Sequence, residues 1–284
     1  MPSKKVGVVG CGTMGAGIVQ VCAQSGYPVV VSEINQELLN KGLASISTAL
    51  SRGVERGRLS QEDKDAALGR IKGTTSIKDF ADCDLVIEVA IENMEIKKKV
   101  FAELDATCPE NAILASNTSV LSVTEMAMAT RRLDRVVGLH FFNPPPVMQL
   151  VEIVRTILVS EETLEFSREF AKSLGKTPVV VPDTPGFIVN RLLLSFILNA
   201  IRMLESGVAS KEDIDTAITL GLNHPIGPLA LADLVGNDII LFMAEGVYQN
   251  LSDHQFIAPT LLRRMVSAGQ LGRKTGKGFY DYKK

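Results

Sequence analysis

Short apolar runs rich in Val, Ile and Leu alternate with stretches of helical periodicity in the first part of the chain. The runs occupy residues 6–9, 29–31, 85–87, 112–114, 136–139 and 179–181. Between the first two runs, Ile18, Val21 and Cys22 recur at the spacing of one helix face, and Gly26 and Pro28 follow as helix-ending residues. Strands that alternate with helices predict an α/β fold with a parallel, doubly wound, Rossmann-like sheet.

Two segments depart from this alternation. Residues 36–71 form a long helical stretch rich in Lys, Arg, Glu and Asp, which predicts an arm that projects from the sheet. Residues 182–186 hold two prolines and a glycine, which are typical of a boundary. Beyond them the pattern predicts helices over 187–206, 211–220, 228–250 and 260–268. We therefore expect a Rossmann-like domain over residues 1–183 and an all-helical domain over residues 184–284.

Composition and charge exclude several classes of protein. The 284 residues are 46% hydrophobic and 22% charged, which is ordinary for a globular protein of about two domains. The net charge of −2 gives no basic field for nucleic acid, and no apolar run reaches the roughly 18 residues that a membrane span needs. The four scattered cysteines form no CxxC pair, which argues against a zinc site or a disulfide framework. We expect a cytoplasmic protein without metal, nucleic-acid or membrane partners.

A glycine-rich turn follows the first predicted strand. Gly10, Gly12 and Gly15 fit the GxGxxG pattern, with Cys11, Thr13 and Met14 between them. Gly10 permits the tight turn, Gly12 admits a pyrophosphate close to the backbone, and Gly15 lets the helix pack on the strand. Glu33 ends the next strand 18 residues after Gly15, where a carboxylate binds ribose hydroxyls and repels a 2′-phosphate. This turn predicts a binding site for NAD rather than NADP.

Polar side chains also follow three later strands, where a parallel sheet binds its ligands. They are Glu88 and Glu92, then residues 116–119 (Ser-Asn-Thr-Ser), and then residues 140–144 (His-Phe-Phe-Asn-Pro). His140 is one of three histidines, and an imidazole can take and return the proton of an alcohol. Glu152 lies in an apolar run twelve residues later, where a carboxylate needs a partner. We expect Glu152 to pair with His140.

Together, these motifs resemble a known family. Residues 116–119, 140–144, 183–191 and 272–280 occur in the order and spacing of the short-chain L-3-hydroxyacyl-CoA dehydrogenases, and the sequence is most similar to the bacterial 3-hydroxybutyryl-CoA dehydrogenases. The resemblance covers nearly the whole chain. It implies reversible oxidation of an L-3-hydroxyacyl-CoA by NAD, with His140 as the catalytic base and Glu152 as its partner.

The resemblance also implies roles for further residues. Ser119 and Asn190 would bond the reacting oxygen and the substrate. Positions that contact the cofactor in the family correspond here to Glu92, Lys97, Asn117, Ser119, Asn143 and Lys274. Coenzyme A would bind at the arm, where Arg52 and Arg56 share one helix face and suit phosphate groups. Both arginines stand where many relatives have lysine. A homodimer through the helical domain is implied as well.

Two alternatives remain open at the level of sequence. One is a dehydrogenase on the same fold that acts on a free hydroxy acid or sugar acid, against which the arginines of the arm argue. The other is a structural NAD-binding protein without turnover, against which the intact set of Ser119, His140, Glu152 and Asn190 argues.

Overall fold

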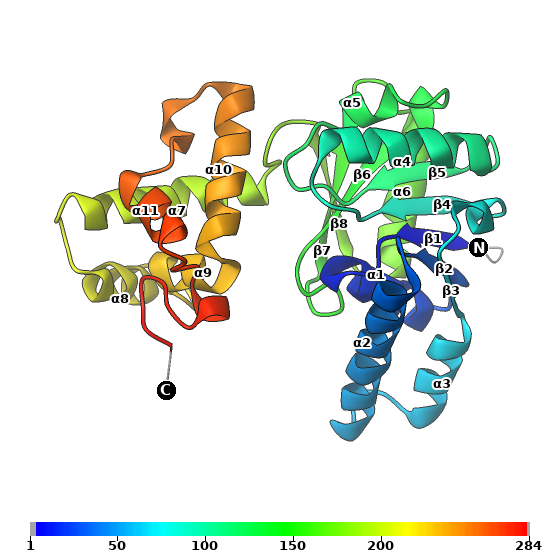
Figure 1. The fold of residues 1–284 in the computed structure, drawn as a ribbon, viewed down its shortest axis with the longest axis horizontal. Helices are drawn as coiled ribbons and strands as arrows, with labels where there is room; N and C mark the ends of the chain where they lie inside the picture. Colours follow the sequence, from blue (N-terminus) through cyan, green and yellow to red (C-terminus); the bar gives the residue numbers. More distant parts are fainter. Residues whose placement is uncertain (1–3, 283–284) are drawn as a thin grey trace. The chain divides into compact units, whose positions relative to one another are not determined.

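The computed structural model describes residues 4–282, which divide into one compact unit up to Asp183 and another from Thr184 onward (Figure 1). In the described part of the first unit, eight strands form one sheet in the order β3-β2-β1-β4-β5-β6-β7-β8. The strands are β1 (Val6–Val9), β2 (Val29–Ser32), β3 (Ile71–Thr74), β4 (Leu85–Glu88), β5 (Ile113–Ser116), β6 (Val136–Phe141), β7 (Leu150–Arg155) and β8 (Thr177–Pro182).

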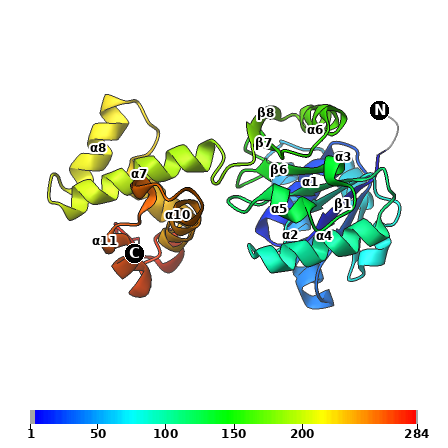
Figure 2. The same cartoon turned by 90° about the horizontal axis from the view of Figure 1, so that it is seen from above.

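Helices cover both faces of the sheet, and the strands β2, β4, β5 and β6 are accordingly buried on both sides. They are α1 (Thr13–Gln24), α4 (Met94–Thr107), α5 (Val123–Ala127) and α6 (Glu161–Ser173), with short 3₁₀ turns at Ile77–Phe80 and Leu133–Arg135. Figure 2 shows α4 and α5 on one side of the sheet and α6 on the other. Alternate residues of each strand enter the two apolar layers. The doubly wound fold class predicted from the sequence is confirmed.

The expectation of an entirely parallel sheet is wrong at one place. Strand β7 runs antiparallel to β6, while β8 returns to run parallel to β7. The connection between β6 and β7 spans residues 142–149. A parallel crossover needs about a dozen residues or more, so this shorter connection allows only an antiparallel return.

The charged segment after β2 folds as two helices rather than one continuous stretch. These are α2 (Gln36–Glu55) and α3 (Gln61–Gly69), and Figure 1 shows both extending away from the sheet. The Asn35 and Ser60 side chains each accept a hydrogen bond from a backbone N–H of the first turn and cap the two helices. Leu39, Ile46 and Leu50 form the buried face of α2, and its charged face stays in solvent.

The second unit is helical in its described part. Its helices are α7 (Val189–Glu205), α8 (Lys211–Gly221), α9 (Pro228–Val235), α10 (Asn237–Leu251) and α11 (Thr260–Ser267), with 3₁₀ turns at His254–Phe256 and Arg273–Thr275. The single helix expected over 228–250 is wrong, because the chain breaks at Gly236. This residue adopts φ +109°, which a helix cannot contain.

Buried carboxylates hold the end of the chain against this unit. Asp233 accepts hydrogen bonds from the Phe279 N–H and the Tyr280 N–H, each at 2.9 Å, and from the Tyr282 hydroxyl at 3.1 Å. Asp215 accepts from the N–H of Leu229 at 2.8 Å at the start of α9. Asp215 also accepts from the Tyr280 hydroxyl at 3.0 Å, so both carboxylates satisfy backbone donors and hold the segment around Tyr280.

Three features of the described residues concern the cysteines, membrane-spanning helices and groups of metal-ligating side chains. All four cysteines are buried free thiols, and burial raises the pKa of Cys108 to about 11 and that of Cys83 to about 12. Among residues 4–282, no helix combines the length and apolar character needed to cross a membrane. In the same range, no three His, Cys, Asp or Glu side chains are grouped to hold a metal ion. The cytoplasmic location stays a prediction.

Candidate active site

The glycine turn between β1 and α1 has the geometry that a pyrophosphate site requires. A Cβ atom on Gly15 would lie 1.9 Å from the Gly10 carbonyl oxygen, and Gly10 itself has φ +102°. A Cβ atom on Gly12 would meet nothing within 4 Å, so this position opens to a ligand. Gly12 is the N-cap of α1 and provides no side-chain cap, and in the first turn Thr13 is exposed while Met14 is partly buried. The helix N-terminus therefore presents backbone donors and positive potential at this turn.

Glu33 lies beside this turn at the end of β2. Its Oε1 accepts a hydrogen bond from the Cys11 N–H at 2.7 Å, and Oε2 accepts from the Ile34 N–H at 3.1 Å. The carboxylate is thus held at the edge of the glycine turn. Burial and the nearby Glu33 carboxylate raise the pKa of the Cys11 thiol to about 11. Cys11 therefore stays neutral near pH 7 and supplies no nucleophile.

A cavity of about 400 Å³ extends from the glycine turn along the arm. Gly12, Thr13 and Glu33 line one part of it, and Lys41 and Ser45 of α2 line another. The loop after β6 also lines it, through Asn143, Pro144, Pro145 and Pro146. The cavity thus connects the predicted cofactor turn with the face of α2 and with the loop that follows β6.

His140 and Glu152 face each other across β6 and β7. The antiparallel register pairs the two residues directly, and the His140 Nδ1 lies 2.7 Å from the Glu152 Oε2. Both side chains are buried, with 4% and 1% of their surface exposed. A carboxylate only accepts hydrogen bonds, so Nδ1 carries the proton and Nε2 is the nitrogen that can accept one.

The loop after β5 brings a hydroxyl to the other side of the imidazole. The Ser119 Oγ lies 3.4 Å from the His140 Nε2. Asn117, two residues earlier, accepts a hydrogen bond from the Phe141 N–H at 2.8 Å through its Oδ1. The ends of β5 and β6 are therefore joined through Asn117, and this junction sets the distance between Ser119 and His140.

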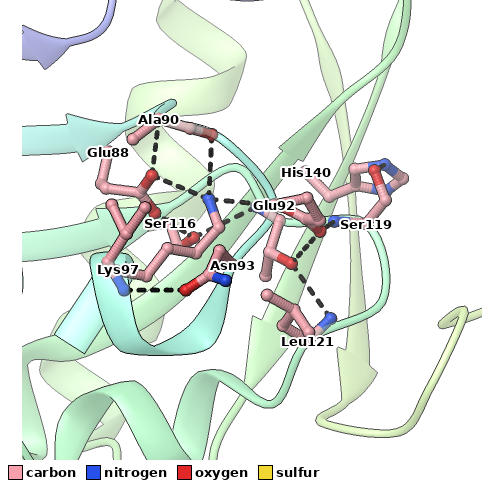
Figure 3. Close-up of polar contacts among 11 residues, drawn as sticks. Glu88, Ala90, Glu92, Asn93, Lys97, Ser116, Ser119, Leu121 and His140 are labelled. Carbon is pink, nitrogen blue, oxygen red and sulfur yellow. Dashed lines mark hydrogen bonds and ion pairs between the residues drawn. The ribbon is translucent and has the colours of Figure 1, made fainter. Parts of the chain in front are cut away.

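Glu92 and Lys97 lie on the segment that follows β4 (Figure 3). The Glu92 Oε1 accepts from the Ser119 N–H at 2.9 Å and from the Thr118 hydroxyl. Lys97 has only 1% of its side chain exposed, and its Nζ lies 3.3 Å from the Glu92 Oε2. Glu92 therefore fixes the backbone of Ser119 by a hydrogen bond, and Lys97 forms an ion pair with Glu92.

Glu88, which the sequence placed at the ligand-binding edge of the sheet without assigning it a role, completes this group. Its Oε1 accepts from the Lys97 Nζ at 2.7 Å and from the Ala90 N–H at 2.6 Å. Its Oε2 accepts from the Ser116 hydroxyl at 2.7 Å. The signal available in the sequence was a carboxylate that ends an apolar strand, since such a residue is buried only with a partner.

Three further predicted site residues are found on the loop after β6 and in the second unit. Asn143 is exposed on the loop after β6 and lines the cavity. Asn190 is buried in the first turn of α7, and Lys274 pairs with Asp238 at 2.6 Å. Both belong to the second unit. Their participation in the site with His140 stays a prediction.

Arg52 and Arg56 lie in the exposed part of the arm. Both side chains point into solvent near the end of α2, four residues apart. Within residues 4–282 neither guanidinium takes part in an ion pair. Arg52 lies in the last turn of α2 and Arg56 is its C-cap, and two neighbouring arginines without a carboxylate partner are suited to phosphate groups.

Comparison with known proteins gives matches over both units. Residues 5–184 match the family described as 3-hydroxyacyl-CoA dehydrogenase, NAD binding domain, and residues 186–282 match its C-terminal domain. The chain is 47% identical to 3-hydroxybutyryl-CoA dehydrogenase of Clostridioides difficile, over 99% of this chain and 100% of that protein. It is 43% identical to the mitochondrial hydroxyacyl-coenzyme A dehydrogenase of Homo sapiens, over 99% of this chain and 91% of that protein.

A solved structure agrees with these sequence matches. The (S)-3-hydroxybutyryl-CoA dehydrogenase of Ralstonia eutropha superimposes with a TM-score of 0.96 at 47% identity, over 99% of each chain. Identity at this level over the full length of both proteins extends far beyond the glycine turn. The chain belongs to the 3-hydroxyacyl-CoA dehydrogenase family, and its first unit carries the NAD-binding domain of that family.

Proposed function

We propose that the chain interconverts L-3-hydroxybutyryl-CoA and acetoacetyl-CoA, with His140 as the group that moves the proton. As a member of its family the protein is an NAD-dependent oxidoreductase that acts on 3-hydroxyacyl-CoA. The four-carbon substrate is supported by the names of the bacterial relatives at 45–47% identity. The observation that carries the proposal is the 2.7 Å contact between His140 and Glu152 at the end of β6.

The residues around the glycine turn fit NAD. The open position at Gly12 and the uncapped start of α1 suit a pyrophosphate, and the Glu33 carboxylate suits ribose hydroxyls. The same carboxylate would repel the 2′-phosphate of NADP. Bound at this turn, NAD⁺ would take up the hydride of the alcohol carbon, and NADH would supply it to the ketone.

The proton moves through the imidazole. In the oxidation, His140 Nε2 accepts the hydroxyl proton of the substrate while Nδ1–H donates to Glu152. The resulting imidazolium is stabilised by the adjacent buried carboxylate, as in other histidine–carboxylate pairs. In the reduction, Nε2–H donates the proton to the developing alkoxide. Glu152 therefore fixes the tautomer and the orientation of His140 in both directions.

Ser119 and Asn190 are proposed to position the reacting oxygen. The Ser119 hydroxyl lies beside His140 Nε2 and can donate to a substrate oxygen. The Asn190 amide would add a second donor when the second unit meets the substrate. Two donors aimed at the same oxygen would polarise the ketone and stabilise negative charge on it.

The first test is a comparison of substrates and cofactors. NADH consumption, followed at 340 nm, should be fast with acetoacetyl-CoA and slower by about 10²-fold or more in kcat/KM with free acetoacetate, because the acid lacks the CoA contacts. NADPH should be poorer than NADH by at least about tenfold, because Glu33 repels its extra phosphate. Equal rates with the free acid would favour the alternative of a hydroxy-acid dehydrogenase.

The second prediction concerns the proton. His140→Gln should lower kcat by about 10²- to 10⁴-fold, because it removes the general base. The dissociation constant for NADH, read by its fluorescence, should stay within about twofold of the parent value because the glycine turn is untouched. The exposed His254 gives a matched control, and His254→Gln should retain full kcat. Near-normal turnover in His140→Gln would rule out His140 as the base.

The third prediction concerns coenzyme A. Replacing both arginines in Arg52→Ala/Arg56→Ala should raise KM for acetoacetyl-CoA by about tenfold, since charge-assisted phosphate contacts are lost. KM for NADH should not change, because Glu33 and the glycine turn are intact. Lys99→Ala removes an exposed cation from α4 and serves as the control. An unchanged KM for the thioester would remove both arginines from the proposed site.

The fourth prediction concerns assembly. Large apolar side chains lie exposed on the second unit, including Leu220 at 81%, Leu192 at 66% and Leu234 at 53% exposure. We propose that part of this surface pairs with a second copy, because exposed apolar patches mark association surfaces. Sedimentation equilibrium should give twice the chain mass of 30.7 kDa. A concentration-independent mass of one chain would contradict the dimer.

A further inference from the structure

Three charged side chains share one buried network behind the loop that carries Ser119. Glu88 is fully buried, Lys97 has 1% of its side chain exposed, and Glu92 has 26% exposed. The Lys97 ammonium has three donors, and they meet Glu88 Oε1 at 2.7 Å, the Ala90 carbonyl oxygen at 3.3 Å and Glu92 Oε2 at 3.3 Å. The ammonium of Lys97 thus interacts with two carboxylates at once.

The hydrogen bonds of Glu88 indicate that it is ionised. Both of its oxygens accept, from the Lys97 ammonium and the Ala90 N–H on one side and from the Ser116 hydroxyl on the other. Ser116 Oγ in turn accepts from the Thr118 N–H at 3.2 Å, so its own proton is directed to Glu88. A buried carboxylate that only accepts hydrogen bonds is the charged form.

The network therefore carries a net negative charge. Two carboxylates and one ammonium leave one unbalanced negative charge. Glu88 and Lys97 form a buried ion pair in which the two charges neutralise each other. The remaining charge lies on Glu92, the one member that reaches the surface, and Glu92 Oε1 contacts the Ser119 N–H. If Glu88 were absent, Lys97 would neutralise Glu92 instead.

This charge lies on the nicotinamide side of the sheet, if the chain binds NAD as proposed above. The glycine turn follows β1 and Glu33 follows β2, so the adenosine half belongs to the β1–β2 side. Glu92 follows β4, Ser119 follows β5, and His140 lies near the end of β6. These three strands lie on the opposite side of β1 from β2 in the strand order. Hydride transfer must occur beside His140, and so near Ser119 and Glu92.

We propose that Glu88 is a positioning residue that neutralises Lys97 and thereby keeps one negative charge on Glu92 beside the nicotinamide ring. The oxidised ring carries a positive charge and the reduced ring carries none. The charge on Glu92 consequently favours binding of NAD⁺ relative to NADH, and Glu88 sets this preference without touching the cofactor. The inference rests on the proposed function and adds the residue that adjusts the balance between the two cofactor forms.

A purely structural role makes a different prediction. If the Glu88–Lys97 pair only anchors α4 to the sheet, breaking it from either side has the same effect. If the pair controls the charge on Glu92, the variants Glu88→Gln and Lys97→Met change the binding of NAD⁺ relative to NADH in different ways. Glu88→Gln leaves Lys97 to neutralise Glu92, whereas Lys97→Met leaves Glu92 negative. The same ion pair is lost in both variants, but the charge beside the ring is not the same.

The experiment measures the dissociation constants of NADH by fluorescence titration and of NAD⁺ by calorimetry, and compares their ratio among variants. In Glu88→Gln the ratio of the NAD⁺ constant to the NADH constant should rise by about fivefold, as expected for one unit charge across a partly exposed site. In Lys97→Met the ratio should stay at the parent value or fall. The double variant Glu88→Gln/Lys97→Met restores the net charge and should return the ratio to the parent value.

Matched controls lie on the same helix. Glu103→Gln and Lys99→Met remove the same charges at exposed positions of α4 and should leave the ratio unchanged. A ratio that rises equally in Glu88→Gln and Lys97→Met, or that stays constant in Glu88→Gln, overturns the proposal. If Glu88→Gln does not fold, Glu92→Gln removes the same charge with the buried pair intact, and its ratio must rise while that of Lys97→Met does not.

The parent protein separates this inference from the proposed function. Absence of NADH binding and of turnover in the parent chain would mean that the proposed function fails. Tight NADH binding and normal turnover in the parent, with identical ratios in every variant, would leave the proposed function intact and remove the role of Glu88 alone.

Discussion

The buried carboxylate of Glu152 is the constraint on which the site depends. It lies inside an apolar strand with 1% of its surface exposed, and a charge in that position must have a partner. The antiparallel return of β7 provides the partner, because it places Glu152 directly opposite His140 in the register. The departure from a parallel sheet is thus tied to the chemistry, and the loop between the two strands, which carries Asn143, follows from it.

That loop is itself held by a buried cation. The Lys176 Nζ donates to the carbonyl oxygens of Pro145 at 2.7 Å and Met148 at 2.8 Å, and burial lowers the pKa of this ammonium. On its other side the loop packs against α1, where a Cβ atom on Gly17 would lie 2.7 Å from Pro145. The segment that lines the cavity beside the glycine turn is therefore fixed from two directions.

Much of this architecture could be predicted from local pattern. The β-branched runs located most strands, the glycine turn indicated a nucleotide site, and a carboxylate within an apolar run led to the pairing of Glu152 with His140. Two of the failures have different causes, one through pairing between distant segments and one through a local backbone conformation. Strand β3 (Ile71–Thr74) has the sequence Ile-Lys-Gly-Thr, which lacks a clear apolar alternation and is stabilised by pairing with β2. The break at Gly236 depends on one positive φ inside an otherwise helical pattern.

Lys97 illustrates why composition alone cannot place a charged residue. A lysine on an amphipathic helix is normally solvated, yet this side chain is buried because Glu88, nine residues earlier, neutralises it at the end of β4. The sequence offers both residues but not their contact, which requires α4 to pack on the sheet.

Hydrogen bonds from backbone N–H groups to side-chain oxygens fix the loops of the site. Glu92 holds the Ser119 N–H, Asn117 holds the Phe141 N–H, and Asp183 accepts from the Thr124 N–H at 2.7 Å at the start of α5. Ser119 and His140 are thus each fixed through other groups rather than through their own 3.4 Å contact. The hydroxyl remains able to rotate about a fixed backbone. It can exchange its weak contact with the imidazole for a stronger one to a substrate oxygen without any movement of the strands.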